Sequence, residues 1–495
     1  MERDPLAFRA GPYLVVLGLL LAVWLASLQG AYPSDDALIH LRYARNLAEH
    51  GELSFNPGEK SYSTTSPLWN ATVGLTASLA AVSEEQLLRY SQAVAAVWLV
   101  LAVVSLLWFG RVLYGRWLPA AAILFVLDPY VTASVHGAME QPLFIALGAL
   151  GLGLVVRGER GSAAALVAAA AVFAIQYAAR PESLAFVAAS GLYLLIRRRP
   201  RGLVVFGVAA ICSHAIALGV LHQVMGSPLP LSMLMKTHDA HGWLPFSSIG
   251  SSRQVLRLFA QVYALPLLAL VVWLVLRAPA QRREFLGRNL LPLLVVGLLA
   301  TAYVGFLKER TVSSRYLVSF TPLVWIVVAD ALGSARRRQF AAAALGGLAV
   351  YLVVLNLLAV PVRVQRGLAL EPERIELGTW LNRNTPPDAT VWVFDIGYIG
   401  YHADRRIYDF NLVDAPGTGT ELALRKRRGE LDLARAIREH RIDYLVWGPT
   451  DLPDLPLERV YTAQHEKHGG HRSIYRVLHG VAADSADPAD PAPRS

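Results

Sequence analysis

The chain has 495 residues, of which 54% are hydrophobic and only 17% are charged. Soluble proteins carry about 25% charged residues, so this composition excludes an ordinary soluble domain and predicts an α-helical protein with many membrane spans. The formal net charge is +9, but the basic residues are spread over short loops, which argues against a nucleic-acid partner. The single cysteine, Cys212, excludes an intrachain disulfide and indicates no cysteine metal site.

Apolar runs of spanning length recur along the first 360 residues. The first follows Arg3 and Arg9, lacks a clear small-residue cleavage site and is long enough to cross a bilayer, so we interpret it as a membrane helix and not as a signal peptide. With the ten later runs it predicts about eleven transmembrane helices, near 11–29, 91–110, 117–135, 140–156, 162–179, 183–196, 203–222, 258–276, 290–307, 316–333 and 340–360.

The segment 67–82 is too short and too polar to be a clear span, and the basic loops decide its place. If it lies on the membrane surface, the clusters of loop arginines all fall on one side, which the positive-inside rule assigns to the cytoplasm. The N-terminus is then cytoplasmic, and the loop 30–90 and the residues after 361 are exoplasmic. The excess of arginine over lysine indicates a bacterial genome, hence the bacterial cytoplasmic membrane. The cytoplasmic loops hold no glycine-rich phosphate cradle, so we expect no nucleotide cofactor.

Residues 361–480 have a different character and alternate between short helical and strand patterns. We expect helices at 373–381 and 431–440 and strands at 390–395, 442–447 and 472–478. The alternation predicts a small exoplasmic α/β domain that follows a transmembrane domain at 1–360. The last segment, 481–495, is rich in Ala, Asp and Pro and is expected to be disordered.

Asp35 and Asp36 stand directly after the first span, at the rim of the membrane. Acidic residues at this position are costly to bury, so two in succession indicate a function. One acid, or Ser34 before it, can instead cap the helix that begins here. Adjacent positions on a helix point about 100° apart, so the two carboxylates are expected to have different roles. A carboxylate held here is suited to act as a base on a membrane-borne substrate.

Several motifs, in order along the chain, resemble those of one superfamily. They are the run 35–48, which contains Arg42, then Phe55-Asn56-Pro57-Gly58-Glu59, Ser63-Thr64-Thr65-Ser66-Pro67-Leu68-Trp69, Gly137-Ala138-Met139-Glu140, Arg180-Pro181-Glu182, 228–236, Arg315-Tyr316-Leu317 and 395–401. The chain resembles the GT-C superfamily of integral membrane glycosyltransferases, and within it the branch that includes mycobacterial terminal arabinofuranosyltransferases. The resemblance runs through nearly the whole chain.

The resemblance implies a helical membrane module, an acid-bearing first exoplasmic loop and a polyprenyl-phosphate-linked sugar as donor. It implies that Asp35 is the catalytic base, with Asp36 as the second choice. Lys236 and Arg315 lie in exoplasmic loops beside spans, where a lipid phosphate would sit, and we expect them to bind it. The alternative for each cation is a side chain that only snorkels to the membrane edge.

The other candidate residues would contact the acceptor, the sugar or a metal ion. Glu140 begins a span at the exoplasmic rim, and with Asp35 and Asp36 it is a candidate ligand of Mg²⁺, Mn²⁺ or Ca²⁺. Its alternative role is that of an acid at a helix start, and Trp69 has the alternative role of a membrane-interface anchor. The expected acceptor or sugar contacts are Glu140, Arg42, Glu182, Trp69 and His136.

The sequence therefore predicts a membrane glycosyltransferase that moves a sugar from a polyprenyl-phosphate donor to an exoplasmic cell-envelope glycan or glycolipid. The subfamily resemblance favours a pentose such as arabinofuranose and leaves a hexose such as mannose open. The alternative class is a transporter or lipid-carrier flippase without transferase activity. Secondary transporters usually have paired halves with broken helices at matching positions, and this sequence has no such pairing.

Overall fold

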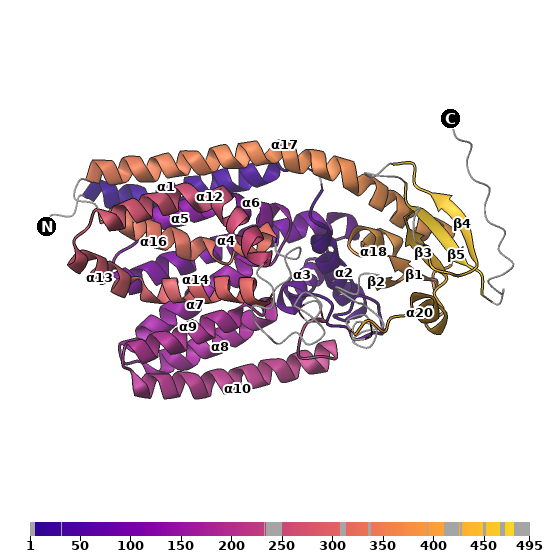
Figure 1. The fold of residues 1–495 in the computed structure, drawn as a ribbon, viewed down its shortest axis with the longest axis horizontal. Helices are drawn as coiled ribbons and strands as arrows, with labels where there is room; N and C mark the ends of the chain where they lie inside the picture. The colour runs from indigo at the N-terminus through magenta and orange to yellow at the C-terminus, as the bar shows by residue number, and fades with distance from the viewer. Residues whose placement is uncertain are drawn as a thin grey trace.

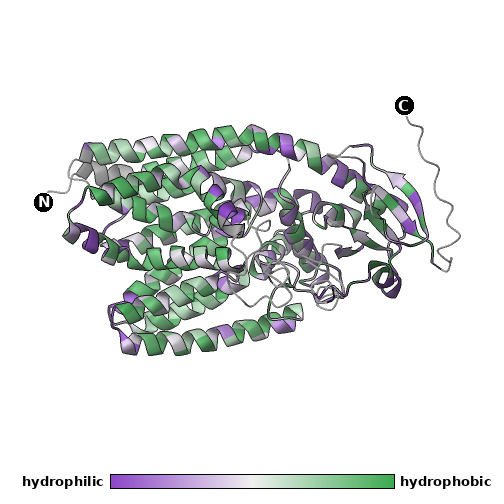
Figure 2. Cartoon of the chain, in the orientation of Figure 1, coloured by the Kyte–Doolittle hydropathy of each residue, from purple (hydrophilic) through white to green (hydrophobic). Residues whose placement is uncertain are grey.

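A helical bundle forms one end of the protein and a β-sheet forms the other, with further short helices between them (Figure 1). The bundle helices are predominantly apolar, whereas the sheet end mixes polar and apolar residues (Figure 2). Long apolar helices of this kind identify a membrane protein. This computed structural model describes residues 5–30, 32–231, 233, 250–306, 313–334, 338–393, 395–409, 425, 428–448, 452–465 and 471–479.

The expected apolar runs all fall on helices of the bundle. Among the described residues, five helices are long and apolar enough to cross a membrane, or seven if the bent pairs α5–α6 and α13–α14 each count as one span. The remaining four runs lie on shorter apolar helices, so the figure of eleven spans stays a prediction. The bundle helices are α1 (Pro5–Ser27), α4 (Glu84–Tyr114), α5 (Pro119–Val126), α6 (Pro129–His136), α7 (Gln141–Glu159), α8 (Ala163–Ala179), α9 (Ser183–Ile196), α10 (Pro200–Met225), α12 (Gly250–Val275), α13 (Pro279–Arg288), α14 (Leu290–Phe306), α15 (Ser314–Leu317), α16 (Thr321–Gly333) and α17 (Arg338–Asn384).

Helices α2 (Asp35–His50) and α3 (Pro67–Leu79) pack against each other between the bundle and the sheet (Figure 1). The 13 residues of α3 make a helix of about 20 Å, shorter than the roughly 30 Å hydrocarbon core of a bilayer. Because α16, which holds one of the predicted spans, also has 13 residues, the surface position of 67–82 stays a prediction. Gly74 permits the close packing, because a Cβ atom there would lie 2.7 Å from the carbonyl oxygen of Ala44.

Helix α17 runs from the bundle to the sheet as one helix of 47 residues (Figure 1). The sequence predicted a span ending at 360 and a separate helix at 373–381. In the structure Pro361 and Pro372 both lie inside α17, so the expected second helix is the last part of the first. A proline removes one backbone N–H and bends a long helix, but neighbouring turns keep their hydrogen bonds.

The C-terminal region contains a five-stranded sheet in the order β2-β1-β3-β5-β4. Strand β1 pairs in parallel with β2 and β3, and β5 pairs antiparallel with β3 and β4. Strands β1, β3 and β5 and helix α20 form at places expected from the sequence, whereas β2, β4 and α18 were not predicted. The predicted tail 481–495 lies outside the described residues. The elements are β1 (Thr390–Val393), α18 (Tyr398–Ala403), β2 (Arg406–Asp409), α20 (Leu433–Glu439), β3 (Tyr444–Trp447), β4 (Leu457–Thr462) and β5 (Ser473–Val477).

Candidate active site

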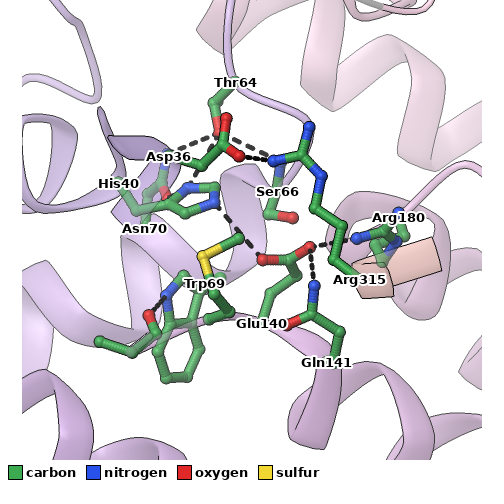
Figure 3. A network of polar contacts seen from close by, with 12 residues as sticks. Asp36, His40, Thr64, Ser66, Trp69, Asn70, Glu140, Gln141, Arg180 and Arg315 are labelled. Atoms are coloured by element: carbon green, nitrogen blue, oxygen red, sulfur yellow. Dashed lines mark hydrogen bonds and ion pairs between the residues drawn. The ribbon is translucent and has the colours of Figure 1, made fainter. Parts of the chain in front are cut away.

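A polar cavity lies where the start of α2, the loop before α3, the start of α7 and the segment α15 meet. It encloses about 370 Å³, including its open side. Its wall combines two acids, three basic side chains and a hydroxyl: Asp36, Glu140, His40, Arg180, Arg315 and Thr64. Several of these side chains point toward one another across the cavity (Figure 3). Charged groups gathered in one concave site indicate a binding or catalytic function.

The first turn of α2 carries both acids of the first loop. Ser34 is the N-cap residue, but its hydroxyl makes no capping hydrogen bond and instead lies 3.6 Å from the sulfur of Met139. Asp35 and Asp36 follow in the first turn, where the helix dipole favours negative charge. The alternative role of Ser34 as a side-chain cap is therefore absent, and the two acids lie where the helix dipole favours them.

Asp35 does not line the cavity; it binds the N-terminus of α18. Its Oδ1 accepts the backbone N–H of Tyr398 at 2.9 Å, and its Oδ2 accepts that of Gly397 at 3.2 Å. Burial, together with the nearby carboxylate of Asp395, raises the pKa of Asp35, although Arg374 opposes the shift. The resemblance gave Asp35 the role of base, but this geometry gives it the role of joining the first loop to the sheet region.

Asp36 faces the cavity and forms an ion pair with Arg315 of α15 (Figure 3). The side chains are 32% and 26% exposed, respectively, so the pair is accessible to solvent and to ligands. Exposed ion pairs contribute only about 0–1 kcal/mol to stability, because water competes with each partner. Arg315 can therefore exchange Asp36 for an anionic ligand at little cost, and that exchange would leave the Asp36 carboxylate free.

Glu140 is fully buried at the start of α7 and is held by charge. Its Oε1 accepts hydrogen bonds from Arg180 and from Gln141. Burial alone would raise the pKa of Glu140, but contacts with Arg180 and His40 outweigh it and lower this pKa to about 2. Its Oε2 accepts no hydrogen bond from the described residues, and the nitrogen Nε2 of His40 lies 3.4 Å away. A buried carboxylate oxygen without a donor can accept a hydrogen bond from a ligand.

Arg180 is the cation that keeps Glu140 charged, and it was not among the predicted site residues. Its guanidinium also binds Oε1 of Glu182, at 3.1 Å from Nε, and lies over the ring of Tyr316 at 5.3 Å. Glu182 therefore pairs with Arg180 and does not itself line the cavity. Arg180 directly follows the apolar run 162–179, and this position is the sequence signal that could have indicated it, whereas its burial is visible only in the structure.

His40 links the polar side of α3 to Glu140. Its Nδ1 lies 2.7 Å from Oδ1 of Asn70, and Nδ2 of Asn70 donates to the hydroxyl of Thr64 at 3.1 Å. Asn70, one of the polar residues that made 67–82 a poor span, therefore supports the site. His40 was not singled out in the sequence, although it stands four positions after Asp36 and hence on the same face of α2.

Two predicted sugar contacts lie away from the cavity. Trp69 is fully buried, and its indole N–H donates to the carbonyl of Ala138 at 3.0 Å (Figure 3). Its ring faces are covered by protein, so the prediction that Trp69 stacks on a sugar is wrong, and it is not an interface anchor either. His136 is not part of the cavity wall; its Nε2 lies 3.3 Å from the carbonyl oxygen of Tyr32.

Arg42 connects the first loop to the C-terminal region. The prediction that it contacts the acceptor or the sugar is not supported by its position. It is buried, and its guanidinium donates to the carbonyl oxygens of Phe55 and Gly400. Asn56 acts alongside it, because its amide makes two 3.0 Å hydrogen bonds with the backbone of Ile407 in β2. The motif 55–59 therefore holds the loop against the sheet.

The three carboxylates expected to share a metal ion do not meet. Asp35 binds α18, Asp36 pairs with Arg315, and Glu140 is enclosed by Arg180 and His40. Within the part of the chain that the structure describes, no three His, Cys, Asp or Glu side chains are grouped to hold a metal ion. These residues do not fit the expected metal site, so the reaction proposed below relies on protein groups alone. Lys236, the other expected phosphate ligand, lies outside the described residues.

The arrangement of helices and sheet is similar to that of several solved structures. ArnT from Cupriavidus metallidurans in the apo state has 13% identity and a TM-score of 0.64, covering 97% of this chain and 99% of that one. The same protein bound to undecaprenyl phosphate has 11% identity and a TM-score of 0.61, with 94% and 98% covered. The Archaeoglobus fulgidus oligosaccharyltransferase tethered with an acceptor peptide has 14% identity and a TM-score of 0.55, with 88% and 69% covered.

The chain therefore has the fold of the GT-C glycosyltransferases, as its motifs predicted. Sequence comparison adds little to this result. Residues 363–482, which contain the end of α17 and the sheet, match a family described as Domain of unknown function (DUF8728). A search of the curated proteins finds no match to the chain.

Proposed function

We propose that this protein is a membrane glycosyltransferase that moves a sugar from a polyprenyl-phosphate donor to a cell-envelope glycan or glycolipid on the exoplasmic face. The proposal is carried by the cavity in which the accessible pair Asp36–Arg315 adjoins the buried pair Glu140–Arg180. The shared fold supports it, because ArnT has been solved with undecaprenyl phosphate bound.

Glycosyl transfer needs a base at the acceptor hydroxyl and positive charge at the leaving phosphate. We assign these roles to Asp36 and Arg315, and keep Lys236 as a second phosphate ligand. When Arg315 turns to the donor phosphate, Asp36 is free to accept the hydroxyl proton. The acceptor oxygen then forms a bond to the anomeric carbon, the bond between that carbon and the phosphate oxygen breaks, and polyprenyl phosphate leaves. Carboxylate charge nearby stabilises the oxocarbenium-like transition state.

Glu140 and His40 serve in this proposal as positioning groups. The Oε2 atom of Glu140, which is buried and receives no hydrogen bond from the described residues, would accept one from a hydroxyl of the sugar or the acceptor. Arg180 keeps this carboxylate ionised, so that it acts only as an acceptor. The polar contact between His40 and Asn70 fixes the orientation of the imidazole ring beside it.

The sugar and the orientation are further parts of the proposal. We place arabinofuranose first as the donor sugar and a hexose such as mannose second. We also propose that the protein lies in a bacterial cytoplasmic membrane with its N-terminus inside and its sheet outside. This orientation is supported by α13 and by the turns from α7 to α8 and from α9 to α10, which carry arginines and lie at the end of the bundle away from the sheet (Figure 1).

The test uses the full-length protein in nanodiscs with synthetic polyprenyl-phosphate pentoses and hexoses and an envelope-glycan acceptor. We expect the wild type to release polyprenyl phosphate from one donor and to form a glycosylated product. Asp36→Asn is expected to lower this rate by about 10²–10⁴-fold, the usual contribution of a general base. Unchanged turnover in Asp36→Asn would contradict the assigned base. Solute flux in vesicles without sugar transfer would favour a transporter instead.

A further inference from the structure

A second pocket lies at the end of the bundle away from the sheet, between the ends of α7, α9 and α13. It encloses about 820 Å³, including its open side. Its charged lining consists of four arginines and two glutamates: Arg160, Arg197, Arg283, Arg288, Glu159 and Glu284. This lining has an excess of positive charge, and nothing in the transfer reaction uses it.

The glutamates of this pocket are already paired, so they do not cancel the positive charge. Glu159 lies 3.3 Å from Arg199, which is outside the pocket wall, and Glu284 lies 3.7 Å from Arg288. Arg288 is further held by the buried carboxylate of Asp330 at 3.0 Å. The positive charge that a ligand can reach therefore comes from the other three arginines of the pocket, Arg160, Arg197 and Arg283.

These three arginines keep most of their hydrogen-bond donors free. Arg160 and Arg197 each donate one hydrogen bond to a backbone carbonyl, at 2.6 and 2.7 Å. The side chain of Arg283 is exposed and makes no hydrogen bond or ion pair with any other residue that the structure describes. A guanidinium has five N–H donors in a planar fork, so this pocket can bind the oxygens of a phosphate group from several directions.

The pocket lies at the boundary between apolar and polar surface. Arg197 directly follows α9, whose last residues Leu195 and Ile196 are 58% and 49% exposed. Leu286 of α13, beside the pocket residue Gly287, is 47% exposed. Exposed apolar side chains next to a basic pocket between membrane helices match the two parts of a phospholipid, its acyl chains and its phosphate.

We propose that this pocket binds the phosphodiester headgroup of an anionic phospholipid, with the acyl chains lying over the exposed leucine and isoleucine side chains. Arginine binds phosphate oxygens in pairs, which favours a defined headgroup position over a diffuse surface attraction. A zwitterionic lipid is disfavoured, because its ammonium group would face the arginines. The site lies at the opposite end of α7 from the Asp36 cavity and shares no lining residue with it, so it stands whether or not the chain transfers sugars.

The test measures binding of phosphatidylglycerol, phosphatidylcholine and glycerol phosphate to the full-length protein in detergent, by native mass spectrometry and thermal shift. The variant is Arg160→Gln/Arg283→Gln. Its matched control is Arg198→Gln/Arg201→Gln, which removes two exposed charges outside the pocket, one from the turn after α9 and one from the first turn of α10. Each arginine near a lipid phosphate changes affinity about fivefold, so we expect the pocket variant to bind phosphatidylglycerol about 25-fold more weakly.

The control variant is expected to bind phosphatidylglycerol with an affinity within about twofold of that of the wild type. Phosphatidylcholine is expected to bind neither the wild type nor the control variant. Equal losses in the two double variants would overturn the proposal, because they would indicate a diffuse surface charge. Binding of glycerol phosphate as tight as that of the lipid would also overturn it and identify a site for soluble phosphate esters. The unfolding midpoints of both variants are also measured without lipid. If these midpoints agree, misfolding is excluded as the cause of a loss of lipid binding.

Discussion

Asp36 pairs with Arg315 in the cavity wall, whereas its neighbour Asp35 turns to the backbone of α18. Two adjacent acids thus connect one helix end to two different parts of the protein. The division follows from helical geometry, because consecutive side chains point about 100° apart. It separates a group that can react from a group that holds the first loop in place.

Asp35→Asn is expected to retain sugar transfer within about tenfold of the wild type, in contrast to the much larger loss in Asp36→Asn. The reason is that the Asp35 carboxylate is engaged by two backbone N–H groups outside the cavity. The measurement is the transfer rate of both variants at saturating donor. If Asp35→Asn lost as much activity as Asp36→Asn with an unchanged unfolding midpoint, Asp35 would be the base, as the resemblance first implied.

Arg315→Gln is expected to raise the KM for the polyprenyl-phosphate donor by about 10–100-fold, which corresponds to one charge-assisted hydrogen bond. Arg315→Lys should fall between this variant and the wild type, because lysine keeps the charge but loses the bidentate geometry. The measurement is donor-dependent initial rates at saturating acceptor.

Arg253→Gln is the matched control, since Arg253 is an exposed arginine near the start of α12 that does not line the cavity. We expect its donor KM to stay within about twofold of the wild-type value. A KM for Arg315→Gln that equals that of Arg253→Gln would show that Arg315 does not contact the donor phosphate.

The fold was predictable from the sequence where local pattern determines it. Apolar runs became helices, and three of the five strands form where residues alternate as strands do. The continuity of α17 was not predictable, because Pro361 and Pro372 are usually helix boundaries and only the surrounding packing keeps them inside. Strands β2 and β4 are the edge strands of the sheet, each paired on one side only, so their residues do not show the continuous apolar pattern of a central strand.

The site was predictable in its location but not in the orientation of its residues. The motif near the first span indicated the two acids, and later motifs indicated Glu140 and Arg315; all but Asp35 of this set line one cavity. Whether Asp35 or Asp36 faces the cavity depends on α18, which follows more than three hundred residues later. The same long-range contact buries Arg42, whose charge alone suggested ligand binding.

Glu140→Gln is expected to destabilise the protein by about 3 kcal/mol at pH 7, because it leaves the buried Arg180 with one carboxylate partner fewer. The folded-state pKa of Glu140 is lowered from its ordinary value of 4.5 to about 2. The charged form therefore stabilises the fold fully above pH 4.5, and this stabilisation is lost as the pH falls toward 2. The measurement is the difference in unfolding midpoint between wild type and variant across this range.

Glu85→Gln is the control for this pH series, since Glu85 is exposed in the first turn of α4. We expect its unfolding midpoint to follow that of the wild type closely at every pH. A gap between Glu140→Gln and wild type that stayed constant down to pH 2 would contradict the lowered pKa of Glu140.

Gly397→Ala is expected to disrupt the contact between α2 and α18. A Cβ atom at Gly397 would lie 2.1 Å from the backbone oxygen of Asp35 and 2.5 Å from its Cγ, so one of the two helices must move. Because α2 also carries Asp36, a shift of about 1 Å in its position is expected to lower the transfer rate by about 10²-fold. The unfolding midpoint should fall as well.

Gly448→Ala is the matched control, since a Cβ atom there meets no other atom within 4 Å. Equal midpoints and equal rates in the two alanine variants would show that the approach of α18 to Asp35 does not position the catalytic loop.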